Sequence, residues 1–262
     1  MAEPGLDLLG LHAFGASNVR DADQIADHAA WIAGEAASLA RRHGFRLRLV
    51  DCGGGLGIPY TDDESPLDLE RLAHRLGAIT DAWSHDPELA DARLLFEPGR
   101  FLVGAAGTYV SRVIVTKPRD GGILALVDGG IHHLIRPALI REEQRIRLLQ
   151  TGTHPAVSAD AAGSGDAAAD TLSPMPLRVS VAGPLCTGTD VLARNAALPE
   201  PVPGDLVAII AAGAYGFTES MPYFLSHPQP AEVVVRGGVA ALARPRLDPV
   251  EVLERQVDPF AS

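Results

Sequence analysis

The first hundred residues alternate short apolar segments with longer amphipathic ones. Apolar positions three to four residues apart predict helices over Asp21–Arg42 and Leu67–His85. Short apolar runs predict strands at Leu6–His12, Phe45–Asp51 and Arg93–Phe96. Strands separated by helices indicate parallel β/α units, whose functional loops follow the carboxyl ends of the strands.

After about residue 105 the pattern changes to apolar, β-branched runs separated by glycine and proline. We therefore divide the chain into a β/α region, 1–105, an all-β region, 106–248, and a tail, 249–262, with at most a short helix. A flexible loop is expected at 151–176, which is rich in Ala, Ser, Asp and Gly. The all-β region is predicted to be an antiparallel sheet or barrel, with strands at Tyr109–Thr116, Ile123–Asp128, Leu177–Ala182, Asp205–Ala211 and Glu232–Arg236.

The predicted fold class is thus α/β plus all-β, and its first region looks incomplete. Three parallel strands with two helices cannot close a barrel, and they leave open edges with apolar faces. The chain reads as though it begins in the middle of a domain.

Composition narrows the class of protein. The 262 residues are 47% hydrophobic, which predicts a folded core, and the net charge of −11 argues against a nucleic-acid or anionic-membrane surface. The sequence has no apolar run near the roughly 20 residues of a membrane-spanning helix. With only two cysteines, Cys52 and Cys186, a disulfide scaffold is excluded and a cytoplasmic location is expected. Lys117 is the single lysine.

Two loops of the first region carry candidate chemistry. Gly53–Gly55 follows a predicted strand, and consecutive glycines allow backbone N–H groups to converge on a phosphate, although a tight turn without a ligand is the alternative. Glu97–Arg100 follows the next strand, where the arginine suits a phosphate and the glutamate a protonated ring nitrogen. A local ion pair at a turn would also explain the charged residues of Glu97–Arg100. Two such loops together favour a phosphorylated cofactor.

The second region offers weaker candidates. Cys186 lies in a loop bracketed by Gly and Pro and is either an exposed proton donor or an inert small side chain. Tyr215 follows a predicted strand and could donate to a phosphate or lie in the core. His132 and His133 suggest a metal, but neighbours on a strand point to opposite faces, so no metal site is expected.

In order and spacing, these motifs resemble the fold-type III pyridoxal-phosphate (PLP) decarboxylases, the family of diaminopimelate, ornithine and arginine decarboxylases. The resemblance extends from Leu9 to Arg246 and covers only the C-terminal part of that family. It implies PLP as cofactor, a small amino acid as substrate, and a fold in which the last strands of a (β/α) TIM-type barrel precede a β domain.

The resemblance also assigns the cofactor site. Gly10–Asn18 looks like the stretch in which a serine, here Ser17, contacts the phosphate and an aromatic ring, here Phe14 in place of histidine, stacks on the pyridine. Gly53, Gly54 and Gly55 match the phosphate-cradling glycines. Glu97 matches the carboxylate that keeps the pyridine nitrogen protonated, and Arg100 matches the basic residue of the phosphate or substrate site.

In the all-β region, Cys186 matches the family's proton donor, and Tyr215 matches the tyrosine that reaches the cofactor across a dimer interface. Arg136 matches an arginine that binds the carboxylate of the substrate. Thr187, in the substrate site, stands where diaminopimelate decarboxylases carry Glu, and Ile140 where they carry Tyr. Both changes weaken recognition of a distal charged group. Some family members act on other amino acids, including carrier-tethered ones. The phenylalanine at the stacking position, Phe14, resembles that branch of the family.

The family's cofactor-anchoring lysine precedes anything that matches Gly10, and Lys117 does not replace it. We therefore expect an enzyme part, which forms a homodimer or is complemented by an N-terminal half carrying the lysine. A non-catalytic, PLP-binding or regulatory homologue and an inactive gene fragment are the alternatives. Neither nucleic acid nor membrane is an expected partner.

Overall fold

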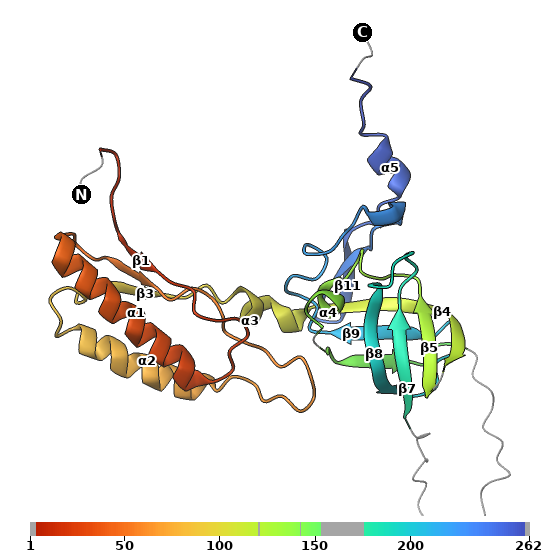
Figure 1. The fold of residues 1–262 in the computed structure, drawn as a ribbon, viewed down its shortest axis with the longest axis horizontal. Helices are drawn as coiled ribbons and strands as arrows, with labels where there is room; N and C mark the ends of the chain where they lie inside the picture. Colours follow the sequence, from red (N-terminus) through yellow and green to blue (C-terminus); the bar gives the residue numbers. More distant parts are fainter. Residues whose placement is uncertain (1–3, 120, 142, 153–175, 260–262) are drawn as a thin grey trace, which may run out of the picture. The chain divides into compact units, whose positions relative to one another are not determined.

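The computed structural model describes residues 4–119, 121–141, 143–152 and 176–259. Contacts divide the chain into two compact units, Met1–Ala106 and Gly107–Ser262 (Figure 1). Almost all of the loop predicted at 151–176 lies outside the described residues.

The first unit contains a three-stranded parallel sheet of β1 (Gly10–His12), β2 (Leu49–Asp51) and β3 (Arg93–Leu95), in that order. Helix α1 (Ala22–His43) follows β1, and α2 (Leu69–Trp83) follows β2. The parallel β/α arrangement predicted from the sequence is confirmed, although each strand is only three residues long.

Local signals explain where α1 begins and ends. The Asp21 side chain accepts hydrogen bonds from the backbone N–H groups of Asp23 and Gln24, which caps the first turn. Gly44 ends the helix with a left-handed φ of 65°. The buried face of α1 is mostly alanine, so it packs closely on a core that includes Val50 and Trp83.

The polypeptide leaves β3 through α3 (Gly99–Val103) and a 3₁₀ turn, η1 (Gly104–Ala106). The second unit contains a six-stranded sheet in the order β6-β9-β4-β5-β7-β8 (Figure 1). Its strands are β4 (Thr108–Arg119), β5 (Gly122–Val127), β6 (Ile146–Leu149), β7 (Leu177–Ala182), β8 (Val191–Leu198) and β9 (Leu206–Ile210).

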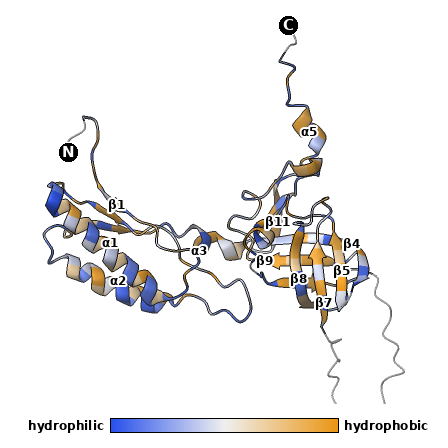
Figure 2. Cartoon of the chain, in the orientation of Figure 1, coloured by the Kyte–Doolittle hydropathy of each residue, from blue (hydrophilic) through white to orange (hydrophobic). Residues whose placement is uncertain are grey.

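The prediction of a purely antiparallel β region was wrong at one junction. β5 and β7 pair in parallel, whereas the other neighbours in the sheet are antiparallel. The sheet is therefore mixed. Its strands are largely hydrophobic (Figure 2), and its core includes Val113, Val127, Val181 and Ile209.

The remaining elements of the second unit are short. A two-stranded antiparallel hairpin pairs β10 (Glu232–Arg236) with β11 (Val239–Arg244). The helical elements are α4 (Arg136–Ile140), η3 (Phe224–Ser226) and α5 (Pro249–Leu253), the last within the predicted tail. In the parts of the chain that are described, no helix has the length and apolar character needed to cross a membrane.

Candidate active site

Three loops of the first unit meet where the strands of its sheet end. The backbone N–H of Glu97, after β3, donates to the carbonyl of Gly53, after β2, at 2.8 Å. A Cβ on Gly54 would lie 2.7 Å from the Glu97 carbonyl oxygen, and a Cβ on Gly55 would lie 2.2 Å from that of Ala16, after β1. The glycines therefore permit a close approach of all three loops, and Gly55 also has a left-handed φ of 92°.

A buried arginine joins two of these loops. Arg100 is 7% exposed, and its guanidinium donates to the Ser17 hydroxyl at 3.1 Å and to the Tyr60 hydroxyl. A guanidinium beside a hydroxyl is a donor set that suits a phosphate. Tyr60 was not predicted, because a tyrosine between Pro59 and Thr61 matches no pattern in the sequence.

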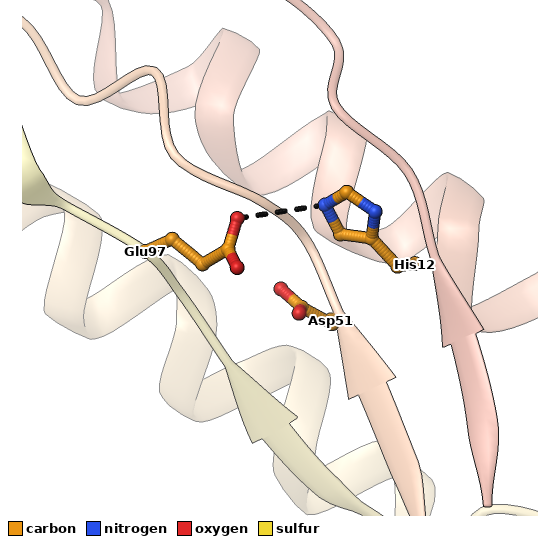
Figure 3. A group of neighbouring side chains, drawn as sticks. All are labelled: His12, Asp51 and Glu97. Carbon is orange, nitrogen blue, oxygen red and sulfur yellow. Dashed lines mark ion pairs between the residues drawn. The ribbon is translucent and has the colours of Figure 1, made fainter. Parts of the chain in front are cut away.

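A second cluster lies at the same strand ends and consists of His12, Asp51 and Glu97 (Figure 3). His12 Nε2 lies 3.5 Å from Glu97 Oε2, and the Asp51 carboxylate accepts the N–H of Gly53 at 2.9 Å. Potential ligand atoms of the three residues lie within 4.8 Å of one another, the one such group found among the described residues. Two carboxylates beside an imidazole favour a cation, either a protonated ring nitrogen or a metal ion.

Of these three residues, the sequence motifs indicated Glu97 but not His12 or Asp51. The available signal was their position, because each is the last residue of a strand that leads into a candidate loop. Phe14 is 58% exposed, and its backbone lies against Gly53, so its ring is accessible for stacking beside these groups.

The two cysteines differ sharply. Cys52 is buried, and burial together with the negative charge of Asp51 raises the pKa of its thiol to about 12, so it stays protonated. Cys186 is exposed in the loop between β7 and β8. In the same loop the hydroxyls of Thr187 and Thr189 lie 2.9 Å apart.

Arg136 and Tyr215 come together in the second unit. The Arg136 guanidinium lies 5.1 Å from the centre of the Tyr215 ring and pairs with Glu219 at 3.1 Å. Arg136 Nε is buried and has no hydrogen-bond partner among the described residues. Tyr215 has a left-handed φ of 60°, a strained conformation of the kind that collects at functional sites. Glu219 was not predicted.

The expectation that the His132 and His133 side chains point to opposite faces of a strand was wrong. Both lie in a turn rather than on a strand, and their ring centres are 3.8 Å apart. His133 Nδ1 contacts the Tyr109 hydroxyl at 3.0 Å, and its Nε2 contacts the Pro228 carbonyl at 2.7 Å. Lys117 lies exposed on β4, in the second unit, opposite Leu124 of β5.

Several known proteins are similar to this chain. Residues 21–213 match the model of the family described as pyridoxal-dependent decarboxylase, C-terminal sheet domain. A diaminopimelate decarboxylase of Streptomyces coelicolor is 34% identical over 97% of this chain and 54% of its own length. An L-glutamyl-[BtrI acyl-carrier protein] decarboxylase of Niallia circulans is 29% identical over 90% of this chain and 52% of its own length.

Solved structures agree. Diaminopimelate decarboxylase of Helicobacter pylori, complexed with L-lysine, matches 96% of this chain and 55% of its own with a TM-score of 0.75 and 25% identity. The chain thus spans about half the length of the relatives it matches. It belongs to the pyridoxal-dependent decarboxylases, a family of carboxy-lyases that use PLP.

Proposed function

We propose that this chain supplies the ring-nitrogen, phosphate and proton-donor groups of a PLP-dependent amino-acid decarboxylase. The observation that carries the proposal is the meeting of the Ser17–Arg100 donors and the Glu97 carboxylate at the strand ends of one sheet. One group suits the phosphate of PLP and the other its protonated ring nitrogen, so the residues present fit the cofactor. Gly53, Gly54 and Gly55 would line the phosphate, and Phe14 would stack on the ring.

Bound PLP supplies an electron sink for the pair of electrons left when the bond between Cα and the carboxylate breaks. Glu97 holds a proton on the ring nitrogen, which keeps that sink charged. The Cys186 thiol then donates its proton to Cα, where CO2 has left, and becomes a thiolate that solvent reprotonates. Arg136 orients the substrate carboxylate through N–H groups that are not paired with Glu219.

We further propose that the substrate is a small amino acid other than diaminopimelate. Thr187 and Ile140 lack the charge and the hydroxyphenyl group that diaminopimelate decarboxylases carry at the matching positions, so they offer little to a distal charged group. A carrier-tethered amino acid would present no free group there. The similarity to the Niallia circulans carrier-protein decarboxylase supports this choice.

The active form is proposed to be a dimer in which Cys186 and Tyr215 serve the opposite subunit. The amine that anchors PLP comes, in this proposal, from a segment outside the matched half of the family. The proposal assigns no such role to Lys117, which lies exposed on β4 of the second unit.

Borohydride reduction tests the proposal. The purified chain is incubated with PLP, its absorbance is recorded, and any pyridoxyl group is located by mass spectrometry after reduction. We expect reversible binding of PLP, no pyridoxyl group on Lys117, and a mass of about 55 kDa by sedimentation equilibrium, twice 27.5 kDa. A label on Lys117 with turnover would show an independent enzyme, and failure to bind PLP would contradict the cofactor site.

A further inference from the structure

A buried carboxylate closes the loop that carries Cys186. Asp190 is 2% exposed, and its two oxygens accept different backbone N–H groups. Oδ2 accepts from Leu185, the residue before Cys186, at 2.7 Å, and Oδ1 accepts from Ile131 at 2.8 Å. One side chain therefore ties the cysteine loop to a second segment of the unit.

Two glycines make room for this carboxylate. A Cβ on Gly130 would lie 2.1 Å from Asp190 Oδ1, and a Cβ on Gly183 would lie 2.4 Å from Oδ2. The carboxylate thus fills a space enclosed by the backbone of both segments. Burial of a charge is costly unless hydrogen bonds compensate it, and the N–H groups of Leu185 and Ile131 do so here.

The second segment leads directly to Arg136. Backbone bonds to the Gly130 carbonyl from His133, at 2.8 Å, and Leu134, at 3.0 Å, form a tight turn after Ile131. The next residue, Ile135, donates to the Ser220 hydroxyl at 3.0 Å.

Ser220 connects this segment to the loop that carries Tyr215. Its hydroxyl donates to the Gly216 carbonyl at 2.7 Å while it accepts the Ile135 N–H. Asp190 and Ser220 together therefore connect the three segments that hold Cys186, Arg136 and Tyr215.

We propose that Asp190 is a positioning residue that fixes the Cys186 thiol relative to the Arg136 segment. That Cys186 transfers a proton from this position rests on the proposed function. That Asp190 fixes the Cys186 loop does not, because the rigidity of the loop can be measured on the chain without cofactor or substrate.

The reactivity of Cys186 is a direct readout, because Cys52 is buried and Cys186 is the exposed thiol. In Asp190→Asn the amide nitrogen cannot accept an N–H, so one of the two segments is released. We expect iodoacetamide to alkylate Cys186 about two- to tenfold faster in this variant, at temperatures well below its unfolding transition.

Asp205 provides a matched control. It is fully buried in the same unit and accepts N–H groups from Thr151, Gly152 and Val202 at 2.8–3.0 Å. Asp205→Asn should therefore lower the melting temperature and leave the alkylation rate of Cys186 unchanged. An equal acceleration in both variants would overturn the positioning role, since it would reflect general loosening.

A second variant and a measurement on the unmodified chain cover the case in which Asp190→Asn does not fold. Gly130→Ala keeps the carboxylate but pushes it from its place, and should accelerate alkylation similarly. In the unmodified chain, the amides of Leu185 and Ile131 should exchange with solvent more slowly than that of Gly188. Unaccelerated alkylation in folded Gly130→Ala, or unprotected Leu185 and Ile131 amides, would overturn the proposal.

Discussion

At the scale of single residues, one arginine of the first unit connects segments that are far apart in the sequence. Arg100 is buried, yet it points its guanidinium at two hydroxyls, those of Ser17 and Tyr60. A cation held in this way is already oriented for an anion, so little entropy is lost when a phosphate arrives.

Arg100→Ala should weaken PLP binding about ten- to a hundredfold, since in the proposed site Arg100 donates charge-assisted hydrogen bonds to the phosphate. Fluorescence titration with PLP gives the Kd, and competition by inorganic phosphate identifies the group that is bound. Arg46→Ala is the control, because Arg46 forms an exposed pair with Asp91 at 2.7 Å. Equal Kd values for the two folded variants would exclude Arg100 from the phosphate site.

At the scale of elements, the sequence predicted what local signals determine. Asp21 and Gly44 mark the ends of α1, so that helix was predicted to within one residue at each end. The pairing of β5 with β7 was missed because it joins segments more than fifty residues apart, and period-two alternation does not state which strands become neighbours. β8 was missed because its sequence, Val-Leu-Ala-Arg-Asn-Ala-Ala-Leu, lacks alternation.

The same limit applies to the site. A loop motif made Glu97 and Arg100 candidates, and the family resemblance made Ser17 one, but Asp190 and Glu219 became visible only through contacts between distant segments. The histidine turn is a further case, because strand geometry was assumed where the backbone turns.

That turn gives the second unit a pH response. His132 is 1% exposed, and burial, followed by the nearby His133, His227 and Arg246, lowers its pKa to about 3. The unfolded chain therefore binds a proton between about pH 6.5 and about pH 3 that the folded chain does not. Stability should fall as the pH falls through this range, by at most about 1.4 kcal/mol per pH unit for this group.

Urea unfolding at a series of pH values, followed by circular dichroism, measures this slope. His132→Leu removes the titrating ring and should flatten the profile, whereas His74→Gln, at an exposed position on α2, should not. An unchanged slope in His132→Leu would assign the pH response to other groups.

At the scale of the whole molecule, the two units differ in the number of strands that stabilise them. Six strands form the sheet around the core of the second unit, whereas the described part of the first unit has three short strands. Leu9, just before β1, and Leu95, the last residue of β3, are exposed. Both tryptophans, Trp31 and Trp83, belong to the first unit, on α1 and α2. Tryptophan fluorescence therefore reports on that unit alone.

Tryptophan fluorescence should accordingly show a lower melting temperature than circular dichroism at wavelengths dominated by the β-sheet of the second unit. PLP, at about 100 times its Kd, should stabilise the first unit by about 2.7 kcal/mol, because the proposed site of Ser17, Glu97 and Arg100 exists only in the folded unit. The fluorescence transition should rise toward the circular-dichroism transition, which itself should move little. Coincident transitions without PLP would show that the two units unfold as one, and an equal rise of both would show that the cofactor stabilises the second unit as well.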